Sequence, residues 1–122
     1  MSASIYFLNG VSIEIASEAP SDLCDEIMAL PQIVELTALA KSDKLVMAAV
    51  ANRDESSVAV MLGVSIAPSF RSIFQGRTFV GDPTTHPLPA SFPELRDKLI
   101  GILQSKYELA YTDVGIILSQ SD

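Results

Sequence analysis

Two residue types that build metal and catalytic sites are almost missing from this sequence, which holds one cysteine, Cys24, and one histidine, His86. A lone cysteine cannot form a disulfide within the chain, and no Cys/His set has metal-ligand spacing. A Ser/His/Asp or Cys/His catalytic arrangement would depend on His86 alone, because an activated serine or cysteine needs a nearby base. We therefore expect no catalytic residue, no metal and no cofactor, and the sequence favours a non-enzymatic protein.

Positive charge is also scarce. The chain has 8 Lys and Arg against 15 Asp and Glu, which gives a net charge of −7 at pH 7 and a pI of about 4.5. Nucleic-acid binding draws much of its free energy from cationic side chains on phosphates. We therefore expect no nucleic-acid partner.

Long apolar runs are absent as well. The most apolar stretches, residues 45–51 and 58–68, are shorter than the roughly 20 residues that a membrane-spanning helix needs. Residues 1–10 contain neither a basic segment nor a continuous apolar segment, so no secretory signal or transit peptide is visible. We expect no contact with a membrane and a cytoplasmic location.

Apolar residues, in contrast, are plentiful. Hydrophobic residues make up 48% of the 122 residues and charged ones 19%, with a mean hydropathy of +0.34. The length suits a single domain over residues 1–122, and the composition excludes intrinsic disorder. Because this apolar content is high for a small soluble monomer, we expect part of the surface to be buried against another chain.

The dipeptide Asn9-Gly10 predicts a turn close to the N-terminus. Apolar and β-branched side chains fill residues 5–8 before it and 11–15 after it. Asn-Gly is the dipeptide that best accepts the positive φ angles of a type I′ turn. The sequence therefore predicts a β-hairpin with one face in the core.

Two consecutive helices are predicted over residues 21–30 and 31–41. Ser21 is a candidate N-cap for the first helix. Pro31 separates the two helices, because proline lacks an amide donor and its ring collides with the preceding turn, whereas it is well suited to a first helical turn. Helical spacing predicts that the second helix buries Val34, Leu36 and Leu39 or their neighbours.

A third helix is predicted from residue 91 to about residue 106 or 108. Ser91 and Glu94 match the S-x-x-E capping box, and the segment carries an apolar stripe at helical spacing. A turn at residues 112–113 and a final strand over residues 114–118 are predicted to follow.

Two strands are predicted over residues 44–52 and 58–67, joined by a polar loop at residues 53–56. Large and small side chains alternate in the second strand, so one of its faces can be approached closely by another layer. That layer is either a helix of the same domain, or a second subunit or ligand. A further short strand is predicted around residues 77–80.

The predicted element order is β-β-α-α-β-β-(β)-α-β, with hairpins in place of regularly alternating strands and helices. Such an order favours an α+β fold with a mostly antiparallel sheet of about five strands and helices packed on one face.

A candidate site for an anionic ligand lies in the least regular part of the chain, at Arg71, Arg77, Thr85 and His86. Arginine forms bidentate hydrogen bonds with phosphate and carboxylate groups. No glycine-rich phosphate loop accompanies these residues. The alternative is that the arginines are solvated or paired with surface acids and that the histidine is an exposed loop residue.

Three aromatic residues are candidates for contact with another protein. Phe70, Phe74 and Phe92 lie beside prolines or in irregular segments, a composition that is common where loops bind proteins. The alternative is that these rings cap the core.

An acidic cluster surrounds the cysteine, at Asp22, Asp25 and Glu26. Paired carboxylates can serve as general acid and base, but acidic residues are also favoured at a helix N-terminus for structural reasons. Negative charge opposes thiolate formation at Cys24, so we expect a small apolar thiol at the contact between helix and sheet.

These observations predict a small acidic binding, adaptor or regulatory protein that acts through self-association or another protein partner. The alternative is a sensor or small enzyme that recognises an anionic small molecule through Arg71, Arg77 and His86.

Overall fold

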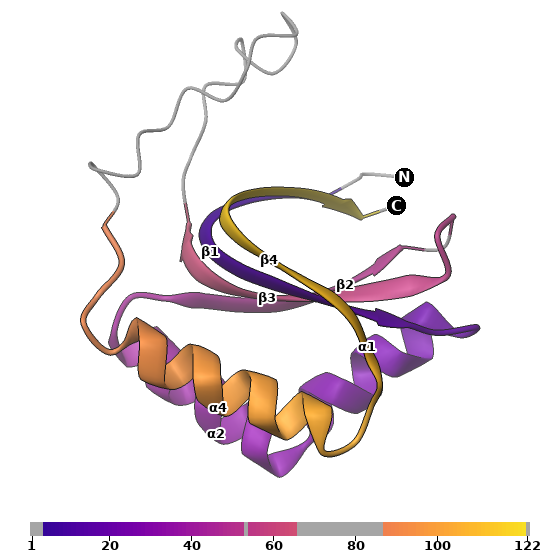
Figure 1. The fold of residues 1–122 in the computed structure, drawn as a ribbon, viewed down its shortest axis with the longest axis horizontal. Coiled ribbons are helices and arrows are strands. Elements are labelled where there is room, and N and C mark those ends of the chain that lie inside the picture. The colour runs from indigo at the N-terminus through magenta and orange to yellow at the C-terminus, as the bar shows by residue number, and fades with distance from the viewer. Residues whose placement is uncertain (1–3, 53, 66–86, 122) are drawn as a thin grey trace, which may run out of the picture.

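The computed structural model describes residues 4–52, 54–65 and 87–121, which form one sheet with helices on one of its faces (Figure 1). The strands are β1 (Ser4–Ala16), β2 (Val46–Asn52), β3 (Ser57–Ser65) and β4 (Leu109–Ser121). The helices are α1 (Pro20–Ala29), α2 (Pro31–Ser42) and α4 (Phe92–Gln104).

The sheet has the strand order β2-β3-β1-β4, and its three pairings are antiparallel. The predicted α+β class, the mostly antiparallel sheet and the helix layer on one face are confirmed. Four strands fall within the described residues, and the strand predicted around residues 77–80 lies outside them.

The predicted N-terminal hairpin is wrong, because residues 4–16 form one continuous strand. A two-residue loop would have paired Leu8 with Val11, but Leu8 pairs with Ser65 of β3 and with Ile117 of β4. β1 is therefore a central strand with a partner on each side. Pairing along both edges outweighs the local turn preference of Asn9-Gly10.

The glycine of that dipeptide has a different role, in a row of glycines that crosses the sheet. Gly10 pairs with Gly63 of β3 and with Gly115 of β4. A Cβ atom on Gly10 would lie 2.6 Å from the Cα of Gly63, and Gly115 has a positive φ of 113°. Side chains are excluded where the backbones come this close, and Figure 1 shows β1 and β4 curving together over the face opposite the helices.

The predicted break between the first two helices is confirmed. Leu30 is extended, with φ −61° and ψ 131°, and Pro31 is the first residue of α2. The predicted cap is wrong, because α1 begins at Pro20 and Ser21 lies inside it. Proline is well placed at a first helical position, where its missing N–H has no partner to lose.

The predicted hairpin of β2 and β3 is confirmed, with Asn52 paired to Ser57. The Asn52 side-chain oxygen accepts a hydrogen bond from the Glu55 amide at 3.2 Å and thereby closes the loop. The predicted turn at residues 112–113 is wrong, because Thr112 and Asp113 pair with β1 inside the long strand β4.

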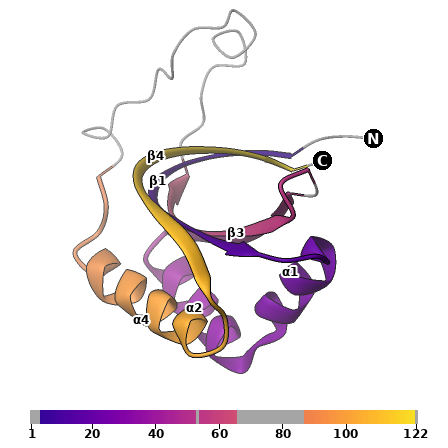
Figure 2. The ribbon, with the colours of Figure 1, turned by 45° about the vertical axis from the view of Figure 1, so that its right-hand side comes forward.

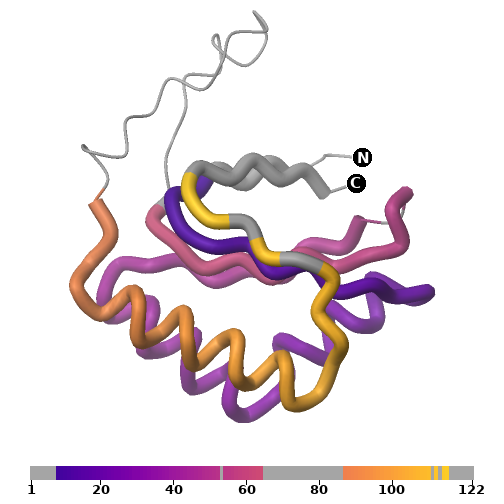
Figure 3. The backbone as a smooth tube through the Cα atoms, viewed as in Figure 1, coloured from indigo at the N-terminus to yellow at the C-terminus, as the bar shows by residue number. Residues whose placement is uncertain are grey.

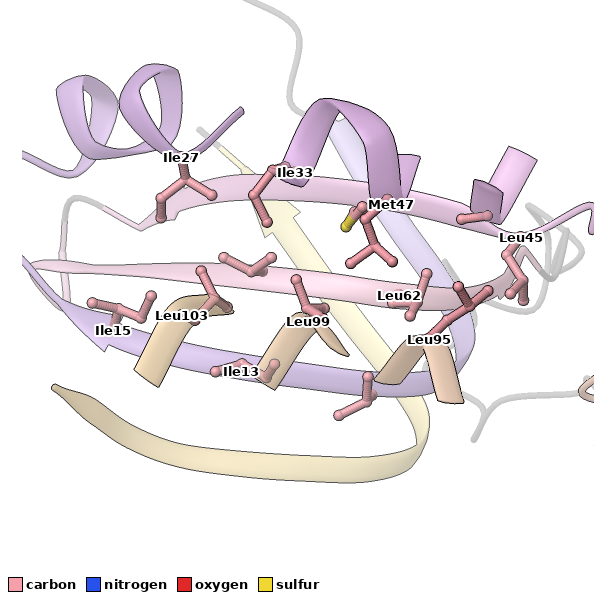
Figure 4. Close-up of a cluster of buried hydrophobic side chains, with 14 of the residues drawn as sticks. Ile13, Ile15, Ile27, Ile33, Leu45, Met47, Leu62, Leu95, Leu99 and Leu103 are labelled. Carbon is pink, nitrogen blue, oxygen red and sulfur yellow. The ribbon is translucent and has the colours of Figure 1, made fainter. Parts of the chain in front are cut away.

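The main core lies between the sheet and the helices. Figure 4 shows Leu95, Leu99 and Leu103 of α4 and Ile33 of α2 directed at the sheet, around Leu62 of β3. Each fully buried side chain of this kind stabilises the fold by about 1.5–3 kcal/mol. The same cluster includes Val11, Ile13, Ile15, Ile27, Leu36, Val58 and Val60.

A smaller cluster of buried side chains consists of Leu8, Val50 and Met61. The large residues of β3, such as Val58 and Val60, belong instead to the main core beside the helices. Since side chains alternate along a strand, Met61 and its small neighbours lie on the face away from the helices. The face of β3 that carries the small side chains therefore does not pack against the helices.

Candidate interaction site on the helix layer

Most of the residues singled out for ligand or protein binding lie outside the described residues. These are Arg71, Arg77, Thr85 and His86 of the candidate anion site, together with Phe70 and Phe74. Both predictions about these six residues stay predictions.

Phe92 is described, and it is the first residue of α4. Only 3% of it is exposed, and it belongs to the main core. The Arg96 guanidinium carbon lies 6.0 Å from the centre of its ring. Phe92 therefore anchors the start of α4 on the sheet.

The acidic cluster and the cysteine occupy α1. Asp22, Asp25 and Glu26 are exposed, while Cys24 is half-buried and packs against the main core. Burial raises the pKa of the Cys24 thiol, and the nearby Asp25 charge raises this pKa further. A thiol of this kind reacts slowly at neutral pH, because the thiolate is the nucleophile. Over the described ranges, no group of three or more His, Cys, Asp or Glu side chains could hold a metal ion.

A groove runs between α2 and α4 on the side of the helices that faces away from the sheet. The two helices lie next to each other in Figures 2 and 3. The groove has a volume of about 510 Å³, and its lining combines apolar, polar and charged side chains. It is lined by Gln32, Glu35, Leu36, Leu39, Lys98, Gly101, Ile102 and Ser105.

The alignment of the two helices is set at one end of the groove. Ser91, just before α4, donates a hydrogen bond from its Oγ to Oδ2 of Asp43, just after α2, at 2.6 Å. The end of α2 therefore meets the start of α4, and the helices run antiparallel. The predicted capping box is wrong, because the Ser91 hydroxyl bonds to Asp43 and makes no cap hydrogen bond.

The burial predicted for α2, at Val34, Leu36 and Leu39 or their neighbours, is confirmed, with neighbours taking two of the three places. Leu36 is buried, but Val34 is 55% exposed and Leu39 is 43% exposed. Ile33 and Ala40 face the core in their place. Val34 and Leu39 therefore lie among polar residues such as Glu35 on the outer side of the helix, and the sheet covers only the inner side.

Gly101 lies in the lining of the groove and in the interior of α4. A Cβ atom built on it would meet no other atom within 4 Å, so packing within the described residues does not require a glycine. Glycine inside a helix lowers helix stability by about 1 kcal/mol relative to alanine.

Two opposite charges flank the groove, Glu35 on α2 and Lys98 on α4. The Lys98 ammonium lies 3.5 Å from Glu94 one turn earlier in the same helix, and both side chains are more than half exposed. Such an exposed pair contributes little to stability, so Lys98 can also bind an incoming carboxylate.

Comparison of the chain with protein-family models, with curated proteins and with solved structures found no match. Of the three helices in the described part of the chain, none has the length and apolar content required to cross a membrane.

Proposed function

We propose that this protein is a small acidic, non-enzymatic binding or adaptor protein that acts through the outer face of its helix layer. The observation that carries the proposal is the exposure of two apolar side chains of α2, Leu39 in the lining of the groove and Val34 outside that lining. Apolar side chains exposed at a groove mark a surface that binds another molecule. A protein partner would complete the covering of α2.

The groove has the composition of a surface that binds a helix. Its apolar residues, Leu36, Leu39 and Ile102, are accompanied by Glu35 and Lys98 at its walls. Apolar grooves with charged borders receive the apolar face of a partner helix, and the charges select its orientation.

We also propose that the protein acts in the cytoplasm. The single cysteine is half-buried and has a raised pKa. Such a chain has no need of an oxidising compartment to form an internal disulfide.

Cross-linked capture with three proteins tests the proposed surface: the wild type, Leu39→Lys, and Val114→Lys as a matched control. Val114 is 69% exposed on β4 and does not line the groove, so its substitution introduces the same charge at an exposed apolar residue elsewhere. We expect Leu39→Lys to reduce the capture of a partner chain at least about tenfold, because the lysine places a charge in the apolar groove. Val114→Lys should leave capture unchanged.

Circular dichroism spectra of the three proteins establish that each variant is folded. Equal capture by all three folded proteins would contradict the proposed surface.

A further inference from the structure

Resting on the proposed function, we infer that the partner on the helix layer is a second copy of this chain, bound about a two-fold axis that runs along α2 and α4. The inference rests on two groove residues of opposite charge, Glu35 and Lys98, and on how far along its helix each of them lies.

The hydrogen bond between Ser91 and Asp43 provides a common origin for the two helices. A helix rises about 1.5 Å per residue, so Glu35 lies about 12 Å along α2 from that origin and Lys98 about 10.5 Å along α4. The acid and the base therefore occupy nearly the same level on opposite walls of the groove.

A two-fold axis parallel to the helices preserves that level. Such an axis places α2 of the second copy over α4 of the first, and α4 over α2. Glu35 of each copy then meets Lys98 of the other, and the pairing occurs twice, as a two-fold interface requires. A two-fold axis across the helices would stack α2 on α2 and α4 on α4, which separates these two residues.

The uncharged residues suit the same arrangement. Val34 lies about 13.5 Å along α2, and Gly101 lies about 15 Å along α4. The exposed valine of one copy therefore comes to the level of the open glycine of the other. A glycine gives a neighbouring helix the room for close approach, which explains its presence in α4 where the fold does not require it.

Charge reversal tests the pairing, with molar mass measured by native mass spectrometry and light scattering at low ionic strength. The proteins are the wild type, Glu35→Lys, Lys98→Glu, an equimolar mixture of these two variants, and Glu55→Lys as a control. Glu55 is exposed in the loop between β2 and β3, away from the groove.

We expect the wild type and the control to have twice the 13.1 kDa of one chain. Each groove variant alone brings two pairs of like charges together, so its dissociation constant should rise at least about tenfold. In the mixture, the lysine introduced by Glu35→Lys meets the glutamate introduced by Lys98→Glu, and the native pair forms at the second contact. The mixture should therefore recover the mass of two chains.

Three results would overturn the inference: a wild-type mass of one chain at all concentrations up to about 1 mM, groove variants that associate as tightly as the wild type, or a mixture of folded variants that does not recover. The proposed function fails separately. If the wild type is a single chain but Leu39→Lys abolishes capture of another protein, the second-copy inference alone is wrong. If Leu39→Lys changes neither molar mass nor capture, the proposed function is wrong as well.

Discussion

Glycines occupy two regions of this protein for opposite reasons. The first region is the bend of the sheet, where Gly10 of β1 pairs with Gly63 of β3. A Cβ atom on Gly63 would lie 2.9 Å from the Cα of Gly10, so the backbones of two strands leave no room for a side chain. In the groove of the helix layer, a Cβ atom on Gly101 would meet nothing within 4 Å.

The comparison separates glycines that the fold requires from a glycine that the fold does not explain. The glycines of the bend are needed for one chain to fold, because they let β1 and β3 approach and curve. Gly101 weakens its own helix and fills no structural need within the described residues. This contrast is the reason that the groove, and not the sheet, is the proposed binding surface.

The largest expected effect is the difference in stability lost when a buried or an exposed leucine is replaced by alanine. Leu99 is fully buried under the sheet, whereas Leu39 is 43% exposed at the groove. We expect Leu99→Ala to lower the free energy of unfolding by about 4 kcal/mol, through lost burial and the cavity left behind. Leu39→Ala should lower it by less than about 0.5 kcal/mol. Denaturant titration of dilute protein measures both, and similar losses would remove the distinction.

Gly10→Ala tests the bend itself. The added methyl group would overlap the backbone of β3, which cannot yield as a flexible side chain would. We expect a loss of about 3 kcal/mol, in the upper range for overpacking. Thermal unfolding followed by circular dichroism gives the loss, and an unchanged midpoint would show that the strands tolerate a side chain there.

Gly101→Ala should have the opposite sign. The alanine favours the helix and meets open space, so we expect the free energy of unfolding to rise by about 0.5–1 kcal/mol. The measurement uses protein too dilute to self-associate. A decrease in stability would mean that Gly101 is needed by the single chain, as Gly10 is.

The smallest expected effect on stability comes from the titration of Tyr107, which follows α4 and lies close to Glu26 of α1. Burial, followed by the charge of Glu26 and a hydrogen bond to it, raises the pKa of Tyr107 above its ordinary value of 10.0. The folded state thus favours the neutral phenol. The stability that this phenol contributes is present below pH 10 and is lost as the pH rises through the raised pKa.

Tyr107→Phe removes that titration. We expect its stability to fall less than that of the wild type between about pH 8 and about pH 11. Urea denaturation midpoints at the two pH values measure the change. Parallel pH profiles would show that Tyr107 does not titrate differently in the folded and unfolded states.

The helices were predicted well because their signals are local. Proline at the start of α2 and the apolar stripe of α4 act within one or two turns, and both helices lie close to their predicted ranges. The predicted capping hydrogen bond of Ser91 was wrong, because its hydroxyl bonds instead to Asp43, which lies 48 residues away along the chain.

The groove was not predicted, although the sequence contained a signal for it. α2 carries more apolar residues than one buried stripe needs, among them Ile33, Val34 and Leu39. Helical spacing predicted burial of Val34, Leu36 and Leu39 or their neighbours, and the structure buries Leu36 and the neighbours Ile33 and Ala40. Periodicity could not decide which side of such a helix faces the sheet, since both sides satisfy it.

Composition and local pattern by themselves determined the fold class, the positions of the three described helices, the break at Pro31 and the hairpin of β2 and β3. Each of these depends on neighbours within a few residues or on the average content of the chain. Only the tertiary structure decided that Asn9-Gly10 lies inside a central strand and that one side of α2 remains uncovered. Both outcomes depend on partners far away in the sequence, because β3 and β4 hold β1 in place and the sheet reaches only one side of the helix layer.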